Sequence, residues 1–123
     1  MNIGDLRTED RLLIHAVAER MADIAATPNP PAWQRWERVR LDDLRTYGPE
    51  YRPGEWFGGG GGTLNGATMM RFRRAIHRLG MAGLLRTASV GGRTRNVKLT
   101  PEGVKLAAEL AGTETTPAAR CDE

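Results

Sequence analysis

The segment from Thr63 to Thr100 constrains the fold more than any other part of the chain, because the spacing of its apolar residues changes from helical to strand-like. The first apolar residues recur at spacings of three, four and three, at Met69, Phe72, Ile76 and Leu79. This row predicts a helix over 63–79, which Thr63 or Asn65 can cap and which Gly80 and Gly83 close. Residues 84–90 then alternate, Gly91-Gly92 predicts a two-residue turn, and residues 93–99 form the returning strand.

Two further helices flank this segment. Thr100-Pro101-Glu102 combines a cap, a proline at the first helical position and an acid in the first turn, so it predicts a helix that ends at Gly112. Near the N-terminus, Thr8 can cap a helix whose buried face carries Leu13, Val17, Met21 and Ile24.

The middle of the chain is less regular. Trp33 and Trp36 indicate a helical turn, residues 39–41 a brief strand, and residues 42–47 a helix. Residues 48–62 end in five consecutive glycines and predict a loop inserted into a domain over 1–112, and residues 113–123 predict a disordered tail. The aromatic residues gathered here could line a pocket or a dimer contact, although such residues most often belong to the core.

Composition narrows the class of protein. The 123 residues suit one domain, and Cys121 is the only thiol, so neither a disulfide nor a cysteine metal cage is expected. The chain has no run of 18 apolar residues and no signal peptide pattern, so we expect a cytoplasmic protein without a membrane partner. The sequence offers no Ser-His-Asp, Cys-His, carboxylate-pair or metal-ligand pattern, so we expect neither an enzyme nor a cofactor.

The charges are separated along the chain. Between Thr63 and Thr100 there are eight basic residues and no Asp or Glu, whereas the remainder holds ten basic and fifteen acidic residues, a net charge of −5. A long segment of one sign is typical of proteins that bind polyanions.

The order of the predicted elements and two short motifs resemble a known family. Residues 74–85, RAIHRLGMAGLL, resemble the "R-A-L-x-R-L-E-x-x-G-L-V" ending of the recognition helix in MarR-like bacterial winged helix-turn-helix regulators. Residues 91–103, GGRTRNVKLTPEG, are similar to their wing, "D-x-R-x-x-x-V-x-L-T-x-x-G", with Gly91 in place of the aspartate. The resemblance implies an α+β, mainly helical winged helix-turn-helix fold with a two-stranded wing and a C-terminal helix. It also implies that Arg93 contacts phosphates or the minor groove.

These observations predict a protein that binds double-stranded DNA sequence-specifically, a transcriptional regulator associated with the nucleoid. The helix over 63–79 would read the major groove and the wing over 84–99 the backbone or minor groove. The expected DNA-binding residues are Asn65, Thr68, Arg71, Arg73, Arg74, Arg78, Arg86, Arg93, Arg95 and Lys98. A homodimer is expected through Leu13, Val17, Met21, Val104, Ala108 and Ala111. The alternatives are a plasmid, phage or chromosome-maintenance factor, or an adaptor for protein or RNA.

Overall fold

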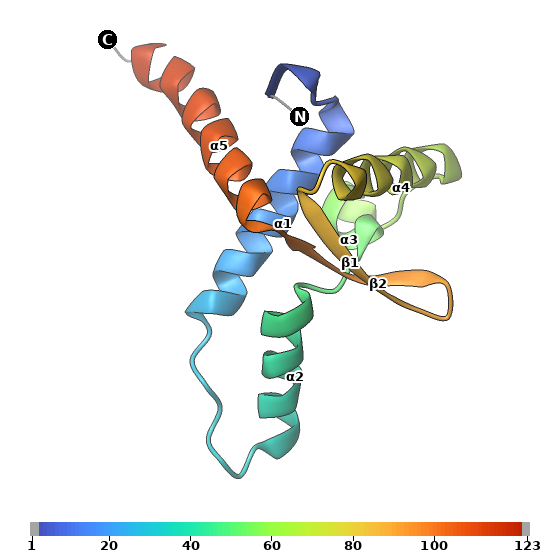
Figure 1. Ribbon diagram of the computed structural model, residues 1–123, viewed down its shortest axis with the longest axis vertical. Coiled ribbons are helices and arrows are strands. Elements are labelled where there is room, and N and C mark those ends of the chain that lie inside the picture. Colours follow the sequence, from blue (N-terminus) through green and yellow to red (C-terminus); the bar gives the residue numbers. More distant parts are fainter. Residues whose placement is uncertain (1–2, 122–123) are drawn as a thin grey trace.

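The computed structural model describes the backbone of residues 3–121 and the side chains of residues 3–112 except residue 60. Its elements are the 3-10 turn η1 (Ile3–Asp5), α1 (Thr8–Ala26), α2 (Arg35–Tyr47), α3 (Pro53–Phe57), the 3-10 turn η2 (Gly59–Gly61), α4 (Gly66–Met81), β1 (Leu85–Val90), β2 (Arg93–Leu99) and α5 (Pro101–Cys121) (Figure 1). The predicted α+β, mainly helical class with a two-stranded antiparallel sheet is therefore confirmed.

The hydrophobic core lies where α1, α4, α5 and the β1–β2 hairpin meet (Figure 1). Leu13 and Val17 of α1 are fully buried, together with Leu79 of α4 and Val97 of β2. Leu106 of α5 closes the same cluster. Because the buried residues of α1 and α4 recur at helical spacing, each helix turns one apolar face inward and leaves the opposite face in solvent.

The hairpin follows the sequence-based prediction. β1 and β2 pair antiparallel, and the turn between them is Gly91-Gly92, with φ values of 59° and 78°. This left-handed geometry favours glycine, because a Cβ would be strained there. The register slips between Ala88 and Ser89, which leaves Arg95 of β2 without a direct partner on β1.

A third segment lies along the outer edge of β2. Glu50 forms an isolated antiparallel bridge with Asn96, and the N–H of Tyr51 donates to the carbonyl of Arg95 at 2.8 Å. The Asn96 side-chain amide donates to the carbonyl of Gly48 at 2.8 Å. Gly48 has a φ of 91°, and a Cβ there would overlap the carbonyl oxygen of Val97, so this approach requires glycine. Residues 48–51 are therefore tied to the sheet.

The prediction for the middle of the chain was wrong in two places. Residues 39–41 belong to the continuous helix α2 and not to a strand, with Leu41 as its buried residue. Residues 48–62 are not a plain loop, because Pro53 begins the short helix α3 and η2 follows it. Trp56 and Phe57 of this region pack against the core, which provides the apolar contacts that hold so short a helix.

Three smaller expectations also need correction. Arg7, and not Thr8, is the cap residue of α1, and its N–H donates to Oδ2 of Asp10 at 2.9 Å. α5 does not end at Gly112 but continues as a helix to Cys121, so the predicted tail is helical over that stretch. The tail residues 122–123 lie outside the described part of the chain. Trp33 and Trp36 are not core residues, because both are exposed.

Candidate nucleic-acid interface

Helix α4 is held on the domain by its apolar face. Phe72, Ala75, Ile76 and Leu79 are buried, and the ring of Phe72 stacks on Phe57 of α3 with centroids 4.0 Å apart and planes 4° from parallel. At the start of the helix, Oδ1 of Asn65 accepts a hydrogen bond from the N–H of Thr68 at 2.8 Å. This cap fixes where α4 begins, and the packing fixes which face it turns outward.

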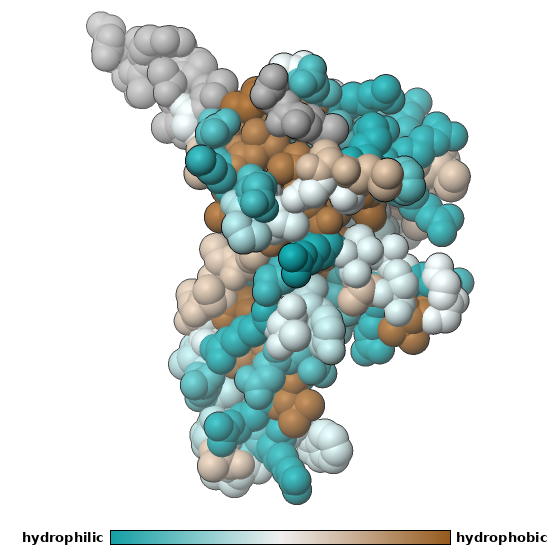
Figure 2. Space-filling view, viewed as in Figure 1, coloured by the Kyte–Doolittle hydropathy of each residue, from teal (hydrophilic) through white to brown (hydrophobic). Residues whose placement is uncertain are grey.

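The exposed sides of α4 carry free positive charge. Arg71, Arg73 and Arg74 are exposed, and none of them makes an ion pair within the part of the chain that the structure describes. Figure 2 shows hydrophilic residues over most of this helix. Two further predicted residues lie at the start of α4: the cap residue Asn65 is exposed while its oxygen caps the helix, and Thr68 is half-buried.

Arg78, the remaining predicted contact on α4, serves the fold. Its Nη2 donates to Oδ1 of Asp10 at 2.7 Å, and the side chain of Arg78 is only 25% exposed. Asp10 is 1% exposed, so this ion pair joins α4 to the start of α1 inside the protein. A guanidinium in this position is committed to a carboxylate and is not presented to a ligand.

The predicted wing residues point in different directions. Arg93 directly follows the Gly91-Gly92 turn and is exposed at the tip of the hairpin. Arg86 and Lys98 are cross-strand partners and so share one face of the sheet. Nζ of Lys98 donates to the last carbonyls of α2, those of Arg45 at 3.0 Å and Thr46 at 3.4 Å, which places this face toward α2.

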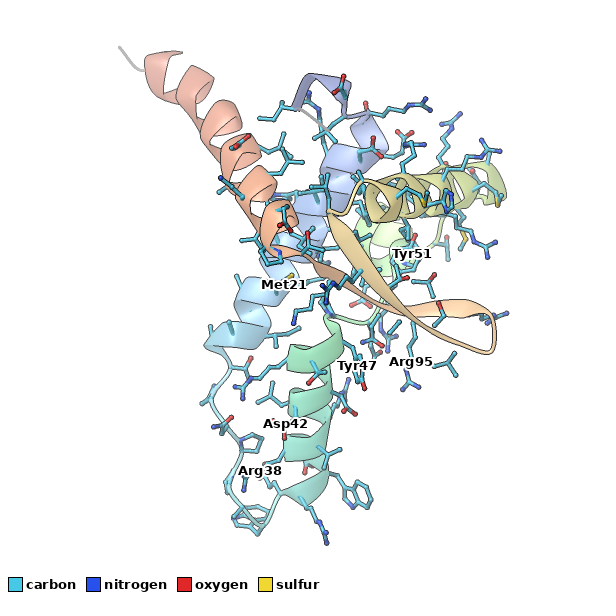
Figure 3. All side chains as sticks on the ribbon, viewed as in Figure 1. Met21, Arg38, Asp42, Tyr47, Tyr51 and Arg95 are labelled. Atoms are coloured by element: carbon cyan, nitrogen blue, oxygen red, sulfur yellow. The ribbon has the colours of Figure 1, made fainter. Side chains whose placement is uncertain are left out.

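Arg95 also lies on the α2 side of the hairpin. It lines a groove between α2 and the hairpin together with Tyr47 (Figure 3). The structure therefore separates the predicted basic residues into three groups. The first lies on α4 and the hairpin tip, and the second is turned toward α2. The third is Arg78 alone, which forms an ion pair with the buried Asp10. The first group comprises Arg71, Arg73 and Arg74, which are spread around the exposed sides of α4, and Arg93 at the hairpin tip; we call these four residues together the α4 arginine surface.

A shallow cavity of about 370 Å³ lies between α4 and the hairpin. Its polar lining is Arg73, His77, Thr87 and Thr94, and only Arg73 of these was among the predicted site residues. The alternation of β1 could have identified Thr87, because a residue two positions after the buried Leu85 faces the same side of the sheet as α4.

Tyr51 packs against α3 and lies near enough to Arg73 to feel its charge. Its ring packs edge-on against Trp56 with centroids 5.7 Å apart, and its hydroxyl is buried without a hydrogen-bond partner among the described residues. Burial raises the pKa of Tyr51 to about 12, and the nearby guanidinium of Arg73 opposes this shift. Tyr51 is therefore a neutral residue that packs against the core.

Other kinds of site find little support in the described residues. No group of three or more His, Cys, Asp or Glu side chains among them is arranged to hold a metal ion. Among the same residues, no helix has the length and apolar character needed to cross a membrane.

Comparison of the chain with protein-family models, curated proteins and solved structures returned no match.

Proposed function

We propose that this protein is a winged helix-turn-helix protein that binds double-stranded DNA, with α4 in the major groove and the β1–β2 hairpin as the wing. The observation that carries the proposal is the α4 arginine surface: three unpaired, exposed arginines on one helix and a fourth on the adjacent hairpin tip. The segment that bears them contains no acidic residue.

The arrangement of the elements supports the same function. An α-helix with its side chains is about 10–12 Å across and enters a major groove about 12 Å wide. α3 and the glycine-rich turn precede α4 in the order expected of a helix-turn-helix, and residues 48–51 add a short segment to the sheet behind it. The hairpin tip and the N-terminal end of α4 extend toward the same side of the molecule (Figure 1).

The residues of the surface divide by position along α4. Side chains near the start of a recognition helix meet base edges, and Arg71 is the first arginine of α4. Its guanidinium has the two parallel donors that guanine accepts at O6 and N7. Arg73, Arg74 and Arg93 fit contacts to phosphates, which position the protein without reading sequence.

Duplex DNA fits better than single-stranded RNA. Proteins that bind single strands stack bases on exposed aromatic rings. Phe72 is the one aromatic residue between Thr63 and Thr100, and it is 3% exposed beneath Phe57. The surface therefore offers charge and hydrogen-bond donors but no stacking platform.

The test is duplex binding measured by fluorescence anisotropy, after selection of a preferred sequence from a random library. Arg71→Ala should lose roughly 5- to 150-fold in affinity, equivalent to about 1–3 kcal/mol, and relax the preference at one base position. The matched control is Arg86→Ala, which removes an exposed arginine from the sheet face turned toward α2 and should leave binding nearly unchanged.

Salt dependence provides a second readout. If the four arginines of the surface each neutralise one phosphate, affinity should fall about 150-fold between 50 and 200 mM salt. Binding that does not change over this range, or equal losses for Arg71→Ala and Arg86→Ala, would contradict the proposal. Mapping of binding sites in the genome then separates a transcriptional regulator, with sites at promoters, from a plasmid, phage or chromosome-maintenance factor.

A further inference from the structure

Helix α2 has an apolar face that the domain does not cover. Its buried residue, Leu41, faces the rest of the protein, whereas Trp36 is 80% exposed and Tyr47 is 52% exposed. Val39 is also exposed on this helix. Rings of this size normally contribute to a core or an interface, so their exposure on one short helix indicates a surface for another molecule.

The exposed residues form one wall of a groove of about 580 Å³ between α2 and the hairpin, and Val90 contributes to the opposite wall. Figure 2 shows hydrophobic residues both on α2 and near the end of the hairpin. This groove lies on the face of the sheet that carries Lys98, whereas α4 packs on the other face. A molecule in the groove would therefore leave the α4 arginine surface open.

The sequence of α2 shows what fits this groove. Trp36, Arg40, Asp43 and Tyr47 all line it, at spacings of four, three and four, which place them in one row along the helix. Consider a second α2 that lies antiparallel to the first, with the two-fold axis passing between positions 41 and 42 of both copies. Each residue of the row then faces a complementary residue of the second copy. Trp36 meets Tyr47 of the second copy, and Arg40 meets Asp43 of the second copy.

The charges support this pairing. Neither Arg40 nor Asp43 makes an ion pair within the described part of the chain. A two-fold axis repeats every contact, so one antiparallel pair of helices would satisfy four charges and cover four aromatic rings. Trp36 and Tyr47 alone supply roughly 300 Å² of the approximately 800 Å² per partner that a stable interface buries. We propose that this protein forms a homodimer through antiparallel pairing of α2 in the groove beside the hairpin.

This interface replaces the one expected from the sequence. Leu13 and Val17 are fully buried within one chain and so cannot contact a partner. Met21, Val104, Ala108 and Ala111 do line an apolar groove of about 550 Å³ between α1 and α5. The polar groups at its edge lie beside groups of their own chain, because Nε2 of His15 is 3.4 Å from Oε2 of Glu19 and Arg11 donates to the carbonyl of Ile3. Of these two grooves, the one beside the hairpin is lined by a row of α2 residues that is complementary to itself and whose charges are unpaired among the described residues.

The experiment is sedimentation equilibrium of the full chain with a charge-swap series. Arg40→Asp places two carboxylates opposite each other at each contact, and Asp43→Arg places two guanidiniums there. Each single variant should weaken the dimer at least tenfold, and the double variant R40D/D43R should restore it. Trp36→Ser should also weaken the dimer, whereas Val104→Asp, in the α1–α5 groove, should not.

All of these positions are exposed, so circular dichroism should show an unchanged fold for each variant. A monomeric wild-type chain at 100 µM, a double variant as weak as the single ones, or dissociation by Val104→Asp alone would each overturn the proposal. The result does not depend on DNA, because no duplex is present in the measurement.

Discussion

Replacing Asp10 by Asn should destabilise the protein by about 3 kcal/mol, although Asp10 belongs to neither proposed surface. The substitution keeps the side-chain oxygen that accepts from the N–H of Arg7, so the cap of α1 is preserved. It removes the negative charge 2.7 Å from Nη2 of Arg78 and leaves that guanidinium without an ion-pair partner. Breaking a buried pair typically costs about 3–5 kcal/mol, and the 25% exposure of Arg78 places the effect at the lower end of this range.

Two further variants separate the ion pair from the cap. Asp10→Ala loses the cap as well and should cost about 1 kcal/mol more than Asp10→Asn. Arg78→Met retains an apolar stem but leaves Asp10, which is 1% exposed, as an unpaired buried charge. It should therefore be more harmful than Asp10→Asn. The double variant D10N/R78M should cost less than the sum of its single substitutions, because neither orphaned charge remains.

The assay is urea unfolding followed by circular dichroism at pH 7, with the free energy obtained by linear extrapolation. A loss of about 3 kcal/mol in a chain of this size corresponds to a decrease in Tm of roughly 12 °C. The reasoning fails if Asp10→Asn changes stability by less than about 0.5 kcal/mol, or if the double-variant cycle gives no coupling. Either result would mean that Asp10 and Arg78 do not stabilise the contact between α1 and α4.

Two other outcomes test the packing. Burial raises the pKa of Tyr51 from 10.0 to about 12. The stability that the neutral Tyr51 contributes is therefore complete below pH 10 and is lost as the pH rises through 12. Urea unfolding at pH 8 and pH 11 should show a loss of stability in the wild type and a smaller loss in Tyr51→Phe. Gly103→Ala should lower the stability by about 1–3 kcal/mol, because the new Cβ would overlap the carbonyl of Leu84. Gly80→Ala should instead raise the stability by about 0.5–1 kcal/mol, because Gly80 is in a helix and has space for a methyl group. Equal melting temperatures for the two glycine variants would contradict this account of the α5 contact.

The sequence alone determined the elements that depend on neighbouring residues. The Gly91-Gly92 turn and the Thr100-Pro101 helix start each act through contacts within a few positions, so their effects can be read locally. The sequence offered Thr63 or Asn65 as the cap of α4, and the structure has Asn65 in that role. The uniform charge of residues 63–100 was equally evident from the sequence.

The tertiary structure decided which residues are available for binding. Arg71 and Arg78 share one helix, yet Arg78 is paired with Asp10, 68 positions away in the sequence. Lys98 is similarly committed to carbonyls at the end of α2. α3 and the segment beside β2 depend on the core and on a sheet edge that is formed much later in the chain. Such contacts have no local signal, because the energy that stabilises them comes from surfaces assembled only when distant segments pack together.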